Sequence, residues 1–132
     1  MTRKVRVMIV DDESHIRRFM HSIVNSVSGV EVIGEADNGE SAILDFHTLQ
    51  PDVVLLDINM PKKNGIEVLE EIKAIKKDTS VIMLTSLSSI EMVKKSVALH
   101  AANYVLKDNS PEKIREVIKQ VCFERISAAA EG

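Results

Sequence analysis

Short apolar runs alternate with longer amphipathic segments along the chain, and this alternation limits the fold more than any other feature. Five runs have the length of strands, at residues 5–10, 30–35, 53–56, 80–85 and 103–107. A segment with apolar residues at helical spacing follows each run, and residues 14–27 give the clearest case. A strand followed by a helix, repeated five times, predicts a parallel sheet with helices on both faces. We therefore expect an α/β fold of the doubly wound (βα)5 type.

The predicted helices have recognisable ends. Asn38, Asn64 and Ser110 stand in front of amphipathic segments, and a glycine or proline directly follows each of them. Ser88 begins a candidate capping box for the fourth helix. Pro51 is expected to close the second helix. These signals divide the chain into the same five strand–helix units.

The composition suits one globular domain, with 132 residues of which 45% are hydrophobic and 28% charged. The net charge of −3 argues against a nucleic-acid or anionic-membrane surface, because both require a basic face. A single cysteine, Cys122, excludes a disulfide within the chain. No apolar stretch approaches the roughly 20 residues of a membrane span. We expect a cytoplasmic protein whose domain covers residues 1–127, followed by a tail at residues 128–132.

Polar residues stand at the ends of four of the predicted strands. Asp11 and Asp12 follow the first strand, and Asp57 follows the third. Thr85 ends the fourth strand and Lys107 the fifth. In an open α/β sheet, ligands bind outside the carboxyl ends of the strands, where the strand order reverses. If the order is 2-1-3-4-5, the first and third strands are neighbours there and the three aspartates share one pocket.

Three carboxylates in one pocket cannot all ionise without a cation. Either some of them carry protons or a metal ion is bound among them. Because the pocket offers oxygen ligands, with no histidine or cysteine cluster nearby, the metal would be Mg²⁺, with Mn²⁺ as the alternative. The hydroxyl of Thr85 and the charge of Lys107 suit a phosphoryl oxygen. The residues thus indicate a metal-assisted phosphate site around Asp57.

Five short motifs carry a resemblance to a known family. They are VDDE at 10–13, LLDINMP at 55–61, NGIEVL at 64–69, MLTS at 83–86 and YVLK at 104–107. In this order, and on a (βα)5 pattern, they resemble the receiver domain of bacterial response regulators, the CheY-like phospho-acceptor family. The resemblance covers about residues 4 to 126. It implies a flavodoxin-like five-stranded sheet in the order 2-1-3-4-5 and a part in two-component signal transduction.

The resemblance also implies a role for each acidic residue of the pocket. Asp57 would accept a phosphoryl group from the phosphohistidine of a sensor histidine kinase or of a phosphotransfer protein. The metal site would consist of Asp11, Asp12, Asp57 and Asn59: Asp12 would bind Mg²⁺ directly, Asp11 mainly through a coordinated water, and Asn59 through its backbone carbonyl. The chain would catalyse only its own phosphorylation and dephosphorylation. We therefore expect a phospho-acceptor switch rather than an enzyme with a separate substrate.

A conformational switch is implied as well. Lys107 would pair with Asp57 and then with the phosphoryl group, while Thr85 would hydrogen-bond a phosphoryl oxygen. Tyr104 would move inward when Thr85 moves. The face formed by the fourth helix, the fifth strand and the fifth helix would then bind a downstream protein or a second copy of the chain. We expect no direct contact of this domain with nucleic acid or a membrane.

Some residues depart from the family pattern. Asp108 stands where the family usually has a proline after Lys107, so the isomer of the bond between them stays open. His100 replaces a glycine before the fifth strand and would be strained in a left-handed conformation. Leu87 gives an attacking water no polar help. Together with Asn59, it predicts moderate to slow self-dephosphorylation.

Two further hypotheses concern the whole protein. The receiver is either free-standing or a fragment of a larger DNA-binding transcriptional regulator, and the sequence is compatible with both. A phosphatase of the haloacid-dehalogenase type would also use an aspartyl nucleophile. However, Asn59 stands where its acid is expected, and 132 residues leave no room for a sizeable cap. The phosphatase hypothesis is therefore set aside.

Overall fold

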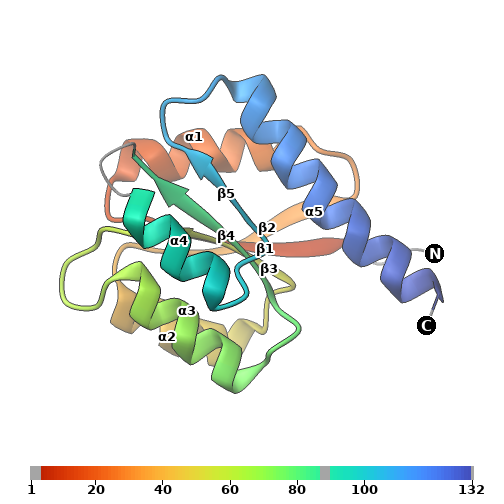
Figure 1. Ribbon diagram of the computed structural model, residues 1–132. Coiled ribbons are helices and arrows are strands. Elements are labelled where there is room, and N and C mark those ends of the chain that lie inside the picture. The colour runs from red at the N-terminus through yellow and green to blue at the C-terminus, as the bar shows by residue number, and fades with distance from the viewer. Residues whose placement is uncertain (1–3, 87–89, 132) are drawn as a thin grey trace.

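Five parallel strands form one sheet in the order β2-β1-β3-β4-β5 in the computed structural model, which describes residues 4–86 and 90–131 (Figure 1). The strands are β1 (Val5–Val10), β2 (Val30–Ala36), β3 (Val53–Asp57), β4 (Ser80–Thr85) and β5 (Asn103–Leu106). The helices are α1 (Ser14–Asn25), α2 (Gly39–Leu49), α3 (Gly65–Ile75), α4 (Ile90–Ala98) and α5 (Pro111–Glu131). The doubly wound (βα)5 architecture and its strand order are therefore confirmed.

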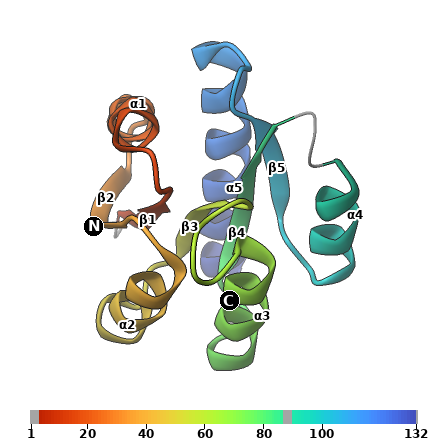
Figure 2. The same cartoon turned by 90° about the vertical axis from the view of Figure 1, so that its left-hand side faces the viewer.

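Helices cover both faces of the sheet, with α1 and α5 on one face and α2, α3 and α4 on the other (Figures 1 and 2). Successive residues of a strand point to opposite faces, so each inner strand contributes to two hydrophobic cores. In β3, Val53 and Leu55 pack on the side of α1 and α5. Val54 and Leu56 pack on the side of α2, α3 and α4. This double burial explains why the inner strands are mostly aliphatic, with Arg6 near the start of β1 as an exception.

The helix ends follow the signals in the sequence. The side chains of Asn38 and Asn64 each accept a hydrogen bond, at 2.9 and 3.0 Å, from the amide three residues further on. Each bond satisfies an amide of the first turn that has no partner within its helix. Gln50, in a left-handed conformation with φ 48°, closes α2 directly before Pro51. The candidate cap Ser88 lies outside the described residues.

Two departures from the family pattern concern the backbone. His100, which lies between α4 and β5, has a φ of 69°. A residue with a Cβ is disfavoured in this left-handed region, so the strain expected at His100 is present. The bond between Lys107 and Asp108 is trans, as is every other peptide bond within the described ranges.

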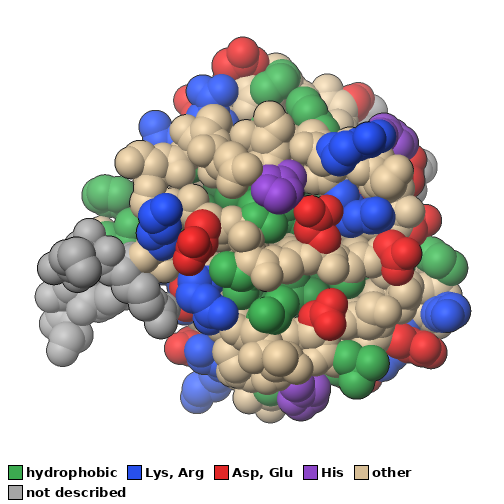
Figure 3. Space-filling view, turned by 180° about the vertical axis from the view of Figure 1, so that it is seen from behind, with side chains coloured by type: hydrophobic (Ala, Val, Ile, Leu, Met, Phe, Trp, Pro, Cys, Tyr) green, Lys and Arg blue, Asp and Glu red, His purple; other side chains and the backbone are tan. Residues whose placement is uncertain are grey.

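The surface carries charges of both signs. On the face seen in Figure 3, acidic and basic side chains are interspersed and do not gather into a basic patch. A face of this kind lacks the concentrated positive charge that binds nucleic-acid phosphates. Among the helices that the structure describes, none is long and apolar enough to span a bilayer.

The last helix continues further than expected, because α5 runs through residues 128–131, which we assigned to a tail. Before this extension, Arg125 ties α5 to the amino ends of the strands. Its guanidinium donates to the carbonyl of Asp78 at 2.6 Å and to Oγ of Ser80 at 3.1 Å. It also lies 3.8 Å from Oδ1 of Asp52, which is buried. The C-terminal half of α5 is therefore anchored to the sheet.

Replacing Arg125 with methionine is expected to lower the free energy of unfolding by about 1–3 kcal/mol, because hydrogen bonds from a charged donor and the contact with a buried carboxylate are lost. Urea unfolding followed by circular dichroism measures the change. Lys119→Met, at an exposed position on the same helix, is the matched control and should change stability by less than about 0.5 kcal/mol. Equal losses in the two variants would contradict an anchoring role for Arg125.

Candidate metal and phosphoryl site

Three aspartates meet at the carboxyl edge of the sheet. Asp11 directly follows β1, and Asp57 ends the neighbouring strand β3, whose Leu56 pairs with Val10. Asp12 comes next in the chain and is exposed. One carboxylate oxygen of each aspartate lies within 4.8 Å of the other two. The structure thus brings together the acidic residues that the strand ends predicted for one pocket.

The side chain of Lys107 completes the cluster. Its Nζ lies 2.9 Å from Oδ2 of Asp11, 3.2 Å from Oδ1 of Asp57 and 3.3 Å from Oε1 of Glu13. The backbone N–H of Lys107 donates to the carbonyl of Thr85 at 2.8 Å, which fixes this residue beside the end of β4. The pairing with Asp57 was expected. The contact with Glu13 was not, since Glu13 drew attention only as part of the acidic motif.

Asp57 is buried and incompletely bonded, with 2% of the residue exposed. Its Oδ1 accepts the backbone N–H of Asn59 at 3.2 Å and faces Lys107. Its Oδ2 has no hydrogen-bond partner among the described residues. A buried carboxylate oxygen without a partner is costly, and an oxygen-binding cation would relieve that cost. The pocket and its oxygen donors therefore fit Mg²⁺.

Burial dominates the protonation of the pocket. It raises the pKa of Asp57 to about 7, an effect that the charge of Asp11 reinforces and the ammonium of Lys107 opposes. Burial also raises the pKa of Asp11, against the N–H of Glu13 and the charge of Lys107. Burial alone would lower the pKa of Lys107, but Asp11 and Asp57 outweigh it and raise this pKa. Lys107 is thus charged at neutral pH, and one ammonium faces several carboxylates.

Hydrogen bonds from two directions hold the turn that carries Asp11. Its Oδ1 accepts the N–H of Glu13 at 2.8 Å, and its own N–H donates to the carbonyl of Ala36 at 3.1 Å. The guanidinium of Arg17, on α1, donates to the carbonyl of Asp11 at 2.7 Å, while its Nε lies 3.4 Å from Oε1 of Glu35. Sequence patterns did not single out Arg17 or Glu35, because their contacts depend on how α1 packs against β2.

Gly65 allows α3 to begin directly against the end of β3. A Cβ at this position would overlap the backbone carbonyl of Asp57 and would lie 2.8 Å from Cα of Ile58. The N–H of Gly65 donates to the carbonyl of Ile58 at 2.8 Å. The glycine that marked a helix start in the sequence therefore also permits a close backbone approach beside Asp57.

The structure also places the residues predicted to sense phosphorylation. Thr85 is buried as the last residue of β4, and its hydroxyl donates to the carbonyl of Ser86 at 3.0 Å. Tyr104, on β5, is 40% exposed. Asn59 is exposed and lies in the loop that follows β3. Leu87 lies outside the described residues. The roles assigned to these residues stay predictions.

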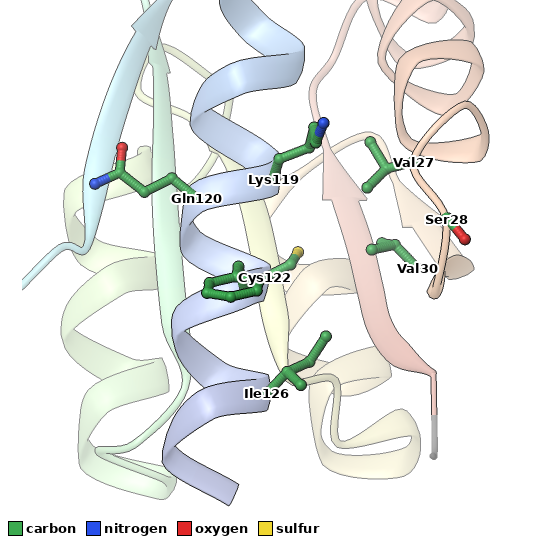
Figure 4. A pocket seen from close by; sticks show the side chains of 8 residues that line it. Val27, Ser28, Val30, Lys119, Gln120, Cys122 and Ile126 are labelled. Atoms are coloured by element: carbon green, nitrogen blue, oxygen red, sulfur yellow. The ribbon is translucent and has the colours of Figure 1, made fainter. Parts of the chain in front are cut away.

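A separate apolar groove lies near the amino ends of the strands (Figure 4). Val27 and Val30 line one side, and Cys122 and Ile126 on α5 line the other, around a volume of about 290 Å³. Burial raises the pKa of the Cys122 thiol to about 11, so it stays protonated at neutral pH and is a poor nucleophile. The acidic pocket, which holds the charged groups, is therefore the candidate site for chemistry.

Comparison with known proteins agrees with the fold. The sequence model of one protein family, the response regulator receiver domain, matches residues 7–119 of this chain. The chain belongs to this family, the phospho-acceptor domains of two-component signalling. Residues 120–131 of α5, which include the Arg125 anchor, lie beyond the matched range.

Relatives of two lengths are similar to this chain. Chemotaxis protein CheY of Thermotoga maritima is 34% identical over 116 residues, covering 88% of this chain and 96% of CheY. The uncharacterized transcriptional regulatory protein YxjL of Bacillus subtilis is 30% identical over 131 residues, covering 96% of this chain but 60% of YxjL. Among solved structures, the REC domain of AraT from Geobacillus stearothermophilus has a TM-score of 0.85 at 26% identity, covering 94% of this chain and 97% of that one.

In the absence of Mg²⁺, the free energy of unfolding should fall as the pH rises from about 4 to about 7, because the raised pKa of Asp57 makes the folded chain keep a proton that the unfolded chain releases. Asp57→Asn removes the part of this dependence that comes from Asp57 and leaves the part that the raised pKa of Asp11 causes. It should raise the free energy of unfolding by about 2–4 kcal/mol at pH 8 and by little at pH 4. Urea unfolding with EDTA at both pH values measures the difference.

The matched control for this measurement is Asp108→Asn, because Asp108 is exposed and its replacement should change stability little at either pH. A gain in Asp57→Asn that is the same at pH 4 and pH 8 would contradict the buried-charge explanation.

Gly65→Ala is expected to lower the free energy of unfolding by about 1–3 kcal/mol, because the added methyl group meets backbone that cannot move without displacing Asp57. Gly34→Ala is the control. A Cβ there meets only the flexible end of the Leu49 side chain, so a smaller loss is expected. Thermal or urea unfolding compares the stability of the two variants. A larger loss of stability for Gly34→Ala would show that the backbone around Gly65 moves easily to accept a methyl group.

Proposed function

We propose that the chain accepts a phosphoryl group on Asp57 from the phosphohistidine of a sensor histidine kinase or of a phosphotransfer protein, in the cytoplasm. The observation that carries this proposal is the unsatisfied Oδ2 of Asp57, a buried carboxylate oxygen beside a lysine ammonium and two further carboxylates. A carboxylate is a usable phosphoryl nucleophile. Phosphoryl transfer asks the protein mainly for positioning and charge neutralisation, which this arrangement supports.

Mg²⁺ would be held by Asp11, Asp12 and Asp57, with the backbone carbonyl of Asn59 as a further ligand. When bound, it would neutralise charge on the phosphoryl group. Asp12 is exposed and suits direct ligation, whereas Asp11 is buried against Lys107 and suits contact through a water. A solved complex of CheX and CheY from Borrelia burgdorferi contains BeF3 and Mg²⁺. Its matched chain is 31% identical, with a TM-score of 0.80, covering 88% of this chain and 87% of that one.

In the transfer, an oxygen of Asp57 bonds to phosphorus as the bond from phosphorus to the histidine nitrogen breaks. The nitrogen keeps the electron pair of that bond and takes a proton from water. Asp57 reacts in its ionised form, which the ammonium of Lys107 at 3.2 Å favours. Lys107 then pairs with a phosphoryl oxygen as well. The hydroxyl of Thr85 turns from the carbonyl of Ser86 to another phosphoryl oxygen.

Phosphorylation would change the surface formed by α4, β5 and α5. The phosphoryl group brings a charge of about −1.5 to −2 and strong acceptor oxygens. Thr85 lies at the end of β4, and Tyr104 lies on the adjacent strand β5, so movement of the first opens a path inward for the second. Turning a two-state switch from mostly off to mostly on takes about 5 kcal/mol, which a few charge-assisted hydrogen bonds can supply. The changed face would bind a downstream protein or a second copy of the chain.

A second proposal concerns the length of the whole protein. The chain spans 96% of CheY but only 60% of YxjL and 55% of the transcriptional regulatory protein YdfI of Bacillus subtilis, which is 35% identical. The receiver would act alone in the first case, and would control a DNA-binding output domain in the second. The length of the complete reading frame distinguishes the two.

Intact mass spectrometry tests the phosphoryl transfer. After incubation with Mg²⁺ and the small phosphodonor phosphoramidate, the protein should gain the mass of one phosphoryl group. The adduct should be absent in Asp57→Asn and absent when EDTA replaces Mg²⁺. An adduct that persists in Asp57→Asn would place the acceptor elsewhere. No adduct and no Mg²⁺ binding on a folded protein would contradict the proposed function.

A further inference from the structure

Glu13 stands at the N-cap of α1 but does not cap this helix. Serine, threonine, aspartate and asparagine are favoured at an N-cap because their short side chains reach the amides of the first turn. The side chain of Glu13 makes no such hydrogen bond. Its carboxylate extends instead to Lys107, with Oε1 at 3.3 Å from Nζ. A residue that is a poor choice for its own helix, yet contacts a functional pocket, points to a role in that pocket.

Glu13 contacts both signs of charge in the pocket. Its backbone N–H donates to Oδ1 of Asp11, and its carboxylate accepts from the ammonium of Lys107. An ammonium has three N–H donors. Three carboxylates surround that of Lys107, with Asp11 at 2.9 Å, Asp57 at 3.2 Å and Glu13 at 3.3 Å. Before any phosphoryl group arrives, the ammonium of Lys107 thus has as many carboxylates within 3.3 Å as it has N–H donors.

A phosphoryl oxygen can pair with Lys107 only if one of these carboxylates gives way. Asp11 is fully buried and Asp57 nearly so, which means that neither can exchange the ammonium for water. The side chain of Glu13 is 47% exposed and makes the longest of the three contacts. Because water can solvate its carboxylate, Glu13 loses Lys107 at the least cost in free energy.

We infer that Glu13 is a positioning residue that holds Lys107 in the unphosphorylated protein and competes with the incoming phosphoryl group for it, an inference that rests on the proposed phosphorylation of Asp57. The carboxylate of Glu13 also repels an anionic phosphodonor. Both effects slow phosphorylation. At the same time, Glu13 adds negative charge beside the three aspartates and offsets part of the positive charge of Lys107, so it strengthens Mg²⁺ binding.

Two variants separate contact from charge. Glu13→Gln removes the negative charge, whereas Glu13→Asp keeps it on a side chain one methylene shorter, which no longer reaches Lys107. Neither removes a helix cap, so both should fold as the wild type does. Glu31→Gln, at an exposed position at the amino end of β2, is the matched control for a lost charge. Its phosphorylation rate and Mg²⁺ affinity should equal those of the wild type.

The rate of phosphorylation is measured by intact mass, with phosphoramidate below saturation and Mg²⁺ at saturation. Glu13→Gln should react about two- to fivefold faster than the wild type, and Glu13→Asp should lie between them. A titration with Mg²⁺ alone, followed by amide NMR shifts, should give Glu13→Gln about twofold weaker binding. If Glu13 had only a structural role, Glu13→Gln would lower both the phosphorylation rate and the Mg²⁺ affinity. Competition for Lys107 instead raises the rate and lowers the affinity.

An unchanged or slower reaction of Glu13→Gln would overturn the inference. A faster Glu13→Gln together with an unchanged Glu13→Asp would also overturn it, because charge repulsion alone would then explain the gain. If the wild type itself gains no phosphoryl group, the proposed function fails. The contact between Glu13 and Lys107 is then tested in the metal-free protein by the NMR signal of the Lys107 ammonium. Its protons should exchange with water faster in Glu13→Gln than in the wild type. Equal exchange rates in the two proteins would show that the contact is absent.

Discussion

The ammonium of Lys107 is the interaction on which the carboxyl edge of the sheet depends. Removal of one partner from a set of buried charges leaves the others uncompensated, which is far costlier than loss of a surface ion pair. Lys107 follows β5, and its partners Asp11, Asp57 and Glu13 come from the end of β1, the end of β3 and the start of α1. One side chain thus links the fifth strand–helix unit to the first and the third. The pocket exists only when all three units are folded.

The two edges of the sheet show what environment does to one residue type. At the amino edge, buried Asp52 accepts the backbone N–H of Arg6 at 2.9 Å and lies beside the guanidinium of Arg125. At the carboxyl edge, one oxygen of buried Asp57 has no donor among the residues that the structure describes, and Asp57 shares its lysine with other carboxylates. Asp52, whose carboxylate has donors around it, stabilises the fold. Asp57, whose carboxylate has fewer donors, is available to bind a cation and to react.

The fold and most of the pocket were predictable from the sequence, for different reasons. Helix and strand periods differ, so the five units could be recognised, and the order of the strands came with the family resemblance. Polar residues after apolar strands located the aspartates and Lys107. The contacts of Glu13 and Arg17 were not predictable, because they depend on where α1 packs. The extent of α5 was missed because alanines 128–130 show no amphipathic pattern, although alanine favours helix.

The unsatisfied oxygen of Asp57 has a consequence for how such a chain drifts over generations. Most random substitutions destabilise a protein, and selection removes those that take it below the stability it needs. At this pocket the expected effect is reversed, because a substitution that removes one of the buried carboxylates should stabilise the fold. A receiver that lost its kinase would therefore drift quickly away from this set of residues. Selection for stability alone would not keep the three aspartates together with Lys107.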